Sequence, residues 1–155
     1  MFNRYIILIL ALLFIAPCSF ADDIADVKNF FNSYVNDANS FSTNIPNYYM
    51  DNAVIERVVH KKDGTKQAVT FPMSAYKEQM AKSAKIAKML GYKNNYKNIN
   101  VIKSGNDFKI SALRYPNKDK VGMPFYFIVT KTSNGYKIKK ESMDTVVQDF
   151  LKHAK

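Results

Sequence analysis

The spacing of apolar residues changes abruptly at Tyr92, and this change constrains the fold more than any other feature of the sequence. Before it, two segments repeat apolar side chains at steps of three and four, which predicts helices over 22–39 and 73–90. After it, apolar and polar residues alternate, which predicts strands. These strands span 98–104, 108–115, 123–132 and 136–144. Short turn clusters of Gly, Asn, Asp and Pro separate them, so we expect an antiparallel meander.

Between the two helices the sequence predicts a β-hairpin. Its strands, 53–59 and 67–71, flank a loop with the favoured Asp63-Gly64 pair. One or two helical turns over 45–50 precede the hairpin, and a short last helix over 145–152 follows the meander. The predicted fold class is therefore α+β, with the N-terminal helices packed on one face of a curved, mainly antiparallel sheet that forms a cone.

The first 21 residues have the layout of a secretory signal peptide. Arg4 supplies a positive start, residues 5–16 are apolar, and residues 19–21 form a small-x-small cleavage site. We therefore expect cleavage after Ala21, a single domain over 22–155, and an exported protein that is periplasmic or secreted. No later segment reaches the ~18 consecutive apolar residues of a membrane helix.

Cys18 is the only cysteine of the chain, and it lies inside the predicted signal peptide. Lipidation of Cys18 is the alternative to simple cleavage, although Pro17 in front of it fits a lipidation site poorly. Cleavage removes the only thiol, which excludes disulfides, cysteine nucleophiles and cysteine-ligated metals from the remaining domain.

The formal net charge of +10 attracts polyanions through long-range, salt-sensitive fields. In an exported protein this charge favours anionic lipids, envelope polymers or an acidic protein partner rather than nucleic acid. Lysines that only keep a domain soluble are the simpler interpretation. The candidate anionic surface is the lysine-rich face of the second helix, with Lys77, Lys82, Lys85 and Lys88.

Residues 47–55, Asn-Tyr-Tyr-Met-Asp-Asn-Ala-Val-Ile, mark a step from a short helix into a strand. This phrase and the order of elements resemble the nuclear-transport-factor-2-like superfamily, the ketosteroid-isomerase-like and cystatin-like α+β cone, in an exported bacterial member. The resemblance covers residues 22–152. It implies an open cone with a pocket between sheet and helices, and in many members homodimerisation through the outer face of the sheet, but fold alone does not transmit function.

Ketosteroid-isomerase-like enzymes use a tyrosine late in the first helix, and Tyr34 matches that place. Their aspartate base falls where this chain has Arg57, which cannot accept a proton at neutral pH. Their second acid falls in the third meander strand, where residues 125–127 are Phe-Tyr-Phe. Because two of the three groups are missing, the resemblance favours a binding protein over that isomerase chemistry.

The predicted function is an exported binding domain whose cone holds a small apolar ligand or a partner segment. The candidate pocket residues are Tyr34, Tyr48, Tyr49, Phe125 and Phe127. The commoner role of such tyrosines is that of a core residue with its hydroxyl near the rim, and this is the alternative interpretation of each of them.

A lyase, isomerase or hydrolase that pairs Tyr34 with Asp144 is the catalytic alternative. Alternation places Asp144 on one face with Tyr136, Ile138 and Ser142, so on an inner face it would be a buried acid or base. Its other interpretation is a cap of the last helix. Glu56 and Glu141 are interpreted as solvated partners of nearby lysines.

The sequence gives little support for a metal site or for a catalytic nucleophile. The two histidines, His60 and His153, lie beside the hairpin turn and near the C-terminal end, with no His-x-x-x-His spacing. We therefore expect no metal site and no cofactor, and no nucleophile-elbow sequence supports a serine hydrolase.

Overall fold

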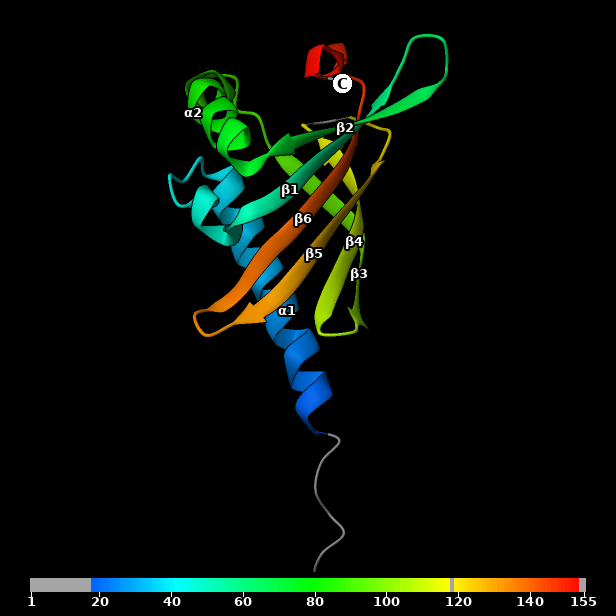
Figure 1. Cartoon of the computed structure of the whole chain (residues 1–155). Helices are drawn as coiled ribbons and strands as arrows, with labels where there is room; N and C mark the ends of the chain where they lie inside the picture. The colour runs from blue at the N-terminus through cyan, green and yellow to red at the C-terminus, as the bar shows by residue number, and fades with distance from the viewer. Residues whose placement is uncertain (1–17, 118, 154–155) are drawn as a thin grey trace, which may run out of the picture.

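A single curved sheet of six strands forms the body of the molecule (Figure 1). The computed structural model describes residues 18–117 and 119–153, so the predicted signal peptide lies largely outside the described residues. The elements follow the predicted order. They are α1 (Cys18–Asn39), the 3-10 helix η1 (Ile45–Tyr48), β1 (Tyr49–His60), β2 (Lys66–Pro72), α2 (Met73–Met89), β3 (Asn94–Ser104), β4 (Asp107–Pro116), β5 (Met123–Thr132), β6 (Gly135–Thr145) and the 3-10 helix η2 (Gln148–His153).

The strand order across the sheet is β2-β1-β6-β5-β4-β3. The last four strands form the predicted antiparallel meander, and β1 and β2 form the predicted hairpin. The hairpin joins the meander through β1 and β6, which run parallel to each other. The sheet is therefore mainly antiparallel, and its first and last strands along the chain lie next to each other inside it.

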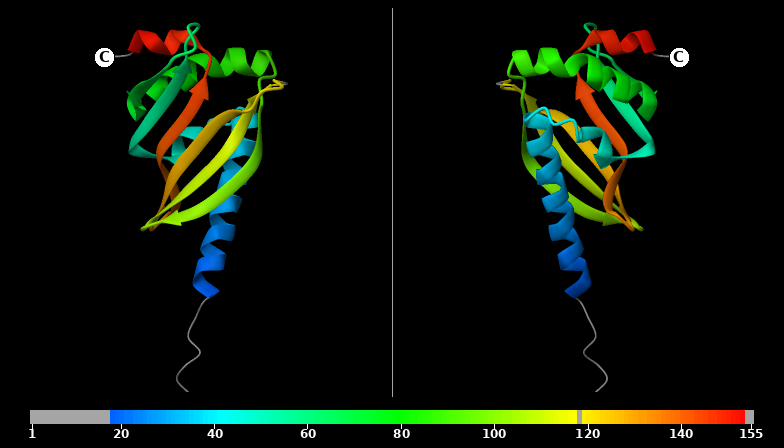
Figure 2. Two further views of the ribbon diagram at one scale, coloured as in Figure 1. Left: turned by 90° about the vertical axis from the view of Figure 1, so that its right-hand side faces the viewer. Right: turned by 90° about the vertical axis from the view of Figure 1, so that its left-hand side faces the viewer.

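The inner face of the sheet wraps around α1, as Figure 2 shows from two sides. Val27 and Phe31 of α1 are fully buried, and the Phe31 ring lies 6.0 Å from that of Phe127 on β5. Along β1 the inward positions alternate as Ala53, Ile55, Arg57 and Val59, all buried. The period of two that predicted these strands thus separates a core face from a solvated face.

Helix α2 crosses the wide end of the cone and buries little of its own surface. Its only buried residue is Met73 at its start, while Tyr76 and Met80 are half-buried against the core. No helix in the described part of the chain is both long enough and apolar enough to cross a bilayer.

The last helix begins later than its sequence pattern predicts. Strand β6 continues to Thr145, and only residues 148–153 turn, as a 3-10 helix. Phe150 from this turn packs on Phe71 of β2, with ring centroids 5.8 Å apart. The chain end therefore closes the sheet beside the hairpin.

Candidate functional site

A buried ion pair lies at the centre of the cone. Arg57 on β1 and Glu141 on β6 are each only 2% exposed, and their Nη2 and Oε1 atoms are 2.7 Å apart. Arg57 also donates from Nη1 to the Glu56 carbonyl at 2.9 Å, and its guanidinium lies 5.0 Å from the centre of the Tyr76 ring. Two charges this deep require such partners, because each loses its hydration on burial.

Three tyrosine hydroxyls extend this pair into a network. Tyr49 donates to Glu141 Oε2, and Tyr76 donates to Glu141 Oε1 at 3.4 Å. The Tyr34 hydroxyl lies 3.1 Å from that of Tyr49. Because the Tyr49 proton is used on Glu141, the Tyr34 proton is the one shared between the two tyrosines.

Burial, followed by the charge of Glu141, raises the pKa of Tyr34 and of Tyr49 well above the usual value. The same causes raise the pKa of Tyr76 to about 12. Burial, the largest single influence, lowers the pKa of Arg57, but the Glu141 carboxylate and the neighbouring tyrosines together outweigh it and raise that pKa. At neutral pH the tyrosines therefore stay neutral and Arg57 stays charged.

The interpretation of Glu141 as a solvated partner of lysines is wrong, and a β-bulge is the reason. Ile128 pairs with Lys140 and Val129 with Ile138, so Lys139 is an extra residue on β6. This insertion reverses the alternation of inward and outward residues along β6. Ile138 and Glu141 both point inward as a result.

The same bulge places Asp144 on the outer face of the sheet. Its carboxylate lies 2.6 Å from His60 Nε2 and 3.1 Å from Lys66 Nζ. Tyr34 lies on the inner side, so the structure does not bring Tyr34 and Asp144 together. Asp144 also does not cap a helix, because β6 runs on to Thr145.

The open space of the cone is a cavity of about 370 Å³ at its mouth, hereafter the mouth cavity. The end of α1 and the loop into η1 form one wall, α2 forms the opposite wall, and the start of β3 completes it. Apolar side chains dominate, and the lining includes Tyr34, Ala38, Phe41, Ile45, Tyr76, Met80, Ala84 and Asn94. The deeper cone is filled by core side chains.

Phe41 at the rim of the mouth cavity has a left-handed backbone, with φ of 60°. It is the second residue after the end of α1, where the Ser42 amide donates to the Asp37 carbonyl at 3.0 Å. This is the Schellman arrangement, whose left-handed position glycine usually occupies. A bulky residue here is strained, and such strain is found at functional sites more often than elsewhere.

Asn94 is the most clearly oriented polar group of the mouth cavity. Its Oδ1 accepts from Arg114 Nη1 at 2.9 Å and from the Tyr92 hydroxyl at 3.4 Å. A guanidinium only donates, so the oxygen must face Arg114 and the amide nitrogen must face away. That nitrogen has no hydrogen-bond partner within the described ranges.

Arg114 itself is a buried cation without a carboxylate. It is 4% exposed, and its other donor, Nη2, reaches the Asp144 carbonyl at 3.2 Å. Its Nε has no partner, and it forms no ion pair with any residue that the structure describes. Glu141 pairs with Arg57, and the other buried carboxylate of the described residues, Asp144, faces His60 and Lys66 on the outer side of the sheet. Arg114 therefore leaves an unpaired positive charge inside the cone.

The predicted pocket residues occupy different places. Tyr34 lines the mouth cavity, and Tyr49 lies behind it in the network. The Tyr48 hydroxyl donates to Asp37 at 2.9 Å, and burial followed by this bond raises the pKa of Tyr48 to about 12. Phe125 and Phe127 are core residues and are not among the residues that line the cavity.

The sequence did not identify four residues of the site, namely Tyr76, Asn94, Arg114 and Glu141. Arg57 is the residue whose position could have indicated the site, because a charged residue at an inward position of an apolar strand requires a buried partner.

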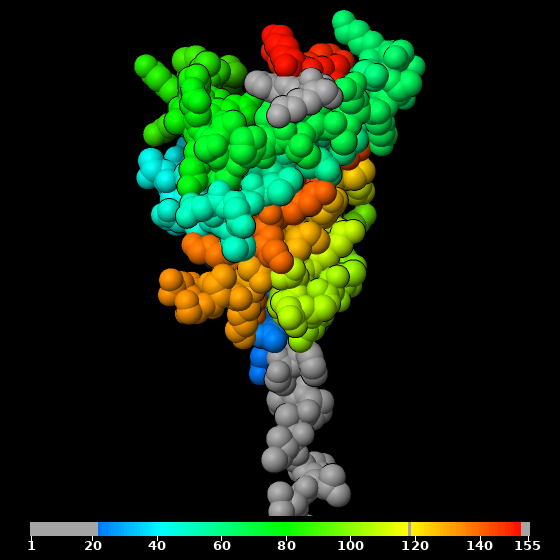
Figure 3. All heavy atoms as spheres, viewed as in Figure 1, coloured from blue at the N-terminus to red at the C-terminus, as the bar shows by residue number. Residues whose placement is uncertain are grey.

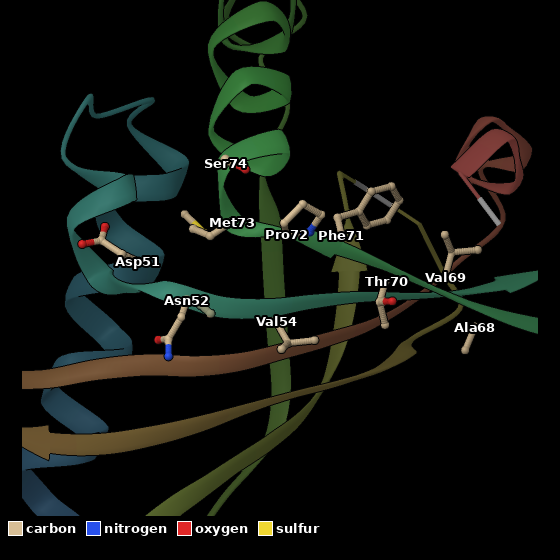
Figure 4. A pocket seen from close by; sticks show the side chains of 11 residues that line it. Asp51, Asn52, Val54, Ala68, Val69, Thr70, Phe71, Pro72, Met73 and Ser74 are labelled. Atoms are coloured by element: carbon tan, nitrogen blue, oxygen red, sulfur yellow. The ribbon is translucent and has the colours of Figure 1, made fainter. Parts of the chain in front are cut away.

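A second hollow, of about 610 Å³, lies at the edge of the sheet where β2 turns into α2 (Figure 4). In the close-up, Asn52, Val54 and Thr70 point to one side of the hairpin and Phe71 to the other. Asp51 at its border already pairs with Lys77 at 3.1 Å. Its lining has no buried charged group, so we do not consider it the site.

The candidate lysines differ from one another. Lys77 pairs with Asp51 and Lys82 with Glu78, whereas Lys85 and Lys88 form no ion pair with any described residue. Across residues 18–117 and 119–153, no group of three or more metal-ligating side chains gathers.

No protein-family model matches the sequence, and a comparison with curated proteins finds no match. Solved structures do match. A nuclear-transport-factor-2-like protein of unknown function from Pseudomonas putida is 12% identical, with a TM-score of 0.61 over 80% of this chain and 87% of its own. A nuclear-transport-factor-2-like protein with a cystatin-like fold from Novosphingobium aromaticivorans is 9% identical, with a TM-score of 0.59 over 82% of this chain and 84% of its own.

A third such protein, also of unknown function, from Shewanella baltica, is 9% identical, with a TM-score of 0.56 over 81% of this chain and 94% of its own. The chain is thus an α+β cone with two helices on a six-stranded open sheet. It has the nuclear-transport-factor-2-like, cystatin-like fold that its sequence resembles.

Proposed function

We propose that this chain is an exported binding domain whose mouth cavity holds a small, mainly apolar ligand with a hydrogen-bond-accepting end, such as a carboxylate. Export after cleavage near Ala21 is part of this proposal. An apolar cavity with a few oriented polar groups is the usual form of a small-molecule site. The observation that carries the proposal is the Asn94 amide nitrogen, a donor at the cavity that has no hydrogen-bond partner among the described residues.

The positive interior favours an anionic end on the ligand. Arg114 holds the Asn94 amide in one orientation and adds a charge that no described carboxylate neutralises. A carboxylate at Asn94 Nδ2 would accept this hydrogen bond within the field of Arg114. The ligand's apolar part would then lie among Phe41, Ile45 and Met80.

The catalytic alternative gains no support from this arrangement. The Tyr34 proton is shared with Tyr49, and Asp144 lies on the other face of the sheet. A donor to a developing oxyanion and a nearby base are therefore not assembled around the mouth cavity.

The first test is mass spectrometry of organic extracts from gently purified protein, which we expect to reveal a co-purified amphipathic acid. The second uses decanoate and decanol as probes in titration calorimetry on stripped protein. We expect decanoate to bind more tightly than decanol. Asn94→Asp keeps an acceptor for Arg114 but removes the donor, so decanoate affinity should fall at least about tenfold, since a hydrogen bond to a charged group contributes about 1.5–3 kcal/mol.

Asn95→Asp is the matched control, because the neighbouring Asn95 side chain is exposed and donates outward to the Asn117 carbonyl. It adds the same charge next to the site and should leave decanoate affinity within about twofold, because an exposed charge is screened. Equal losses in both variants, or probe-induced amide shifts in NMR that map away from the cavity, would overturn the proposal.

A further inference from the structure

One end of the molecule exposes large apolar side chains that the fold does not cover. Ile86, Met89 and Leu90 at the end of α2 are 56%, 77% and 70% exposed, and Val121 in the connection between β4 and β5 is 71% exposed. The two segments are adjacent, because the Asn117 amide donates to the Lys93 carbonyl at 2.6 Å and Leu90 and Asp119 border one hollow. Figure 2 shows the end of α2 meeting this connection at the wide end of the cone.

Lysines surround these apolar residues. Residues 79–106 contain six lysines and no acidic residue. Lys85, Lys88, Lys93 and Lys120 are exposed and form no ion pair with any residue in the described part of the chain. We call the four apolar residues and these four lysines the basic tip. One acidic side chain, Asp119, borders the same hollow as Leu90 and Lys93.

Half of the lysines elsewhere in the described part of the chain pair with a carboxylate. Lys66, Lys131, Lys139 and Lys140 each lie within 3.1 Å of a carboxylate. In the basic tip, by contrast, none of the four lysines pairs with a carboxylate of the described residues, and all four lie beside the exposed apolar residues. The basic tip therefore differs from an ordinary solvated helix face, which has no need of Met and Leu at its most exposed positions.

The shape of the basic tip fits a flat partner. In the space-filling view of Figure 3, α2 lies at an upper corner of the molecule, and Figure 2 shows that its end lies at this same wide end of the cone, far from the start of α1. A projecting helix end can place single apolar side chains among lipid acyl chains while flanking lysines contact anionic headgroups. An acidic protein partner would satisfy the lysines, but it would need a groove of its own to cover the apolar residues.

We propose that the basic tip docks on the surface of a bilayer that contains anionic lipid. The end of α2 inserts Met89 and Leu90 to the headgroup level, and Lys85, Lys88, Lys93 and Lys120 neutralise lipid phosphates. This surface is distinct from the mouth cavity, so docking does not depend on the identity of any cavity ligand.

The test is sedimentation of the full chain with vesicles of equal parts phosphatidylglycerol and phosphatidylcholine, against vesicles of phosphatidylcholine alone. Binding should require the anionic lipid and weaken with salt. Lys85→Gln/Lys88→Gln should lower the partition coefficient about ten- to thirtyfold, since each basic residue near such a surface contributes about a factor of five. Met89→Ser/Leu90→Ser should lower it several-fold and make the remainder fully salt-sensitive.

Lys28→Gln/Lys103→Gln is the matched control, with the same change in net charge at exposed lysines outside the basic tip. It should leave the partition coefficient within about twofold, because fields decay over a Debye length of about 8 Å at physiological salt. Thermal unfolding of every variant verifies that the fold persists. Equal loss in the control and the Lys85/Lys88 variant, or vesicle binding unchanged by both tip variants, would overturn the proposal and leave a protein partner as the occupant.

Discussion

The Arg57–Glu141 pair is a buried contact, which costs more to break than an ion pair on the surface. Both charges are removed from water, and the pair is balanced only because Tyr49, Tyr76 and the Glu56 carbonyl satisfy the remaining donors and acceptors. Such a pair is worth little in net stability, yet loss of one partner leaves an uncompensated buried charge.

We therefore predict that Glu141→Leu lowers the free energy of unfolding by about 3–5 kcal/mol, because Arg57 is left charged and unpaired. The double variant Arg57→Met/Glu141→Leu should recover most of this loss. Urea unfolding followed by circular dichroism measures both. Glu56→Gln is the control: this outer-face carboxylate, with Lys140 at 3.1 Å, should cost less than about 1 kcal/mol.

A double variant no more stable than Glu141→Leu would contradict this account, because it would mean that packing rather than charge sets the cost.

At the scale of elements, the sequence predicts most of the secondary structure. Nearly every helix and strand lies within a few residues of its expected range, because the periods of 3.6 and 2 record burial directly. Periodicity could not predict which side chains of β6 point into the core. The alternation of apolar and polar residues gives no sign of the bulge at Lys139. Without the bulge, alternation places Glu141 on the outer face of the sheet and Asp144 on the inner face, the reverse of what the structure shows.

The end of α1 offers a prediction that separates backbone strain from packing. At Phe41, with φ of 60°, Phe41→Gly should be more stable than Phe41→Ala by about 1 kcal/mol. This order is the reverse of that within an ordinary helix, where alanine is favoured over glycine by a similar amount.

Both substitutions remove the ring, so their difference in the midpoint of urea unfolding reports the backbone alone. Both should also weaken decanoate binding, since the rim of the mouth cavity loses its aromatic side chain. If the alanine variant is the more stable of the two, the left-handed conformation at this position is not strained.

At the scale of the whole molecule, the sequence predicts the meander and the hairpin but not how they join. Alternation defines the faces of a strand and says nothing about its neighbour across the sheet. The parallel pairing of β1 with β6 brings residues 49–60 beside residues 135–145, and this pairing positions Arg57 and Glu141 together. The candidate site therefore depends on a long-range contact that no local pattern encodes.

Truncation tests this dependence. A chain that ends at Thr132 lacks β6 and should show the narrow amide dispersion of an unfolded protein in NMR, because β1 and β2 lose their connection to the sheet. A chain that ends at Val147 lacks only η2 and should stay folded. It should unfold at lower urea, since it loses the contact between Phe150 and Phe71. Cooperative unfolding of the shorter chain would contradict the central role of β6.

The position of β6 in the sheet also affects when the chain can fold during its synthesis. Synthesis proceeds from the N-terminus, so the hairpin leaves the ribosome before the strand that it must pair with. Until residues 135–145 emerge, the nascent chain cannot close its sheet and stays unfolded. We expect a protein of this topology to remain threadable through a narrow translocation channel for nearly the whole of its synthesis.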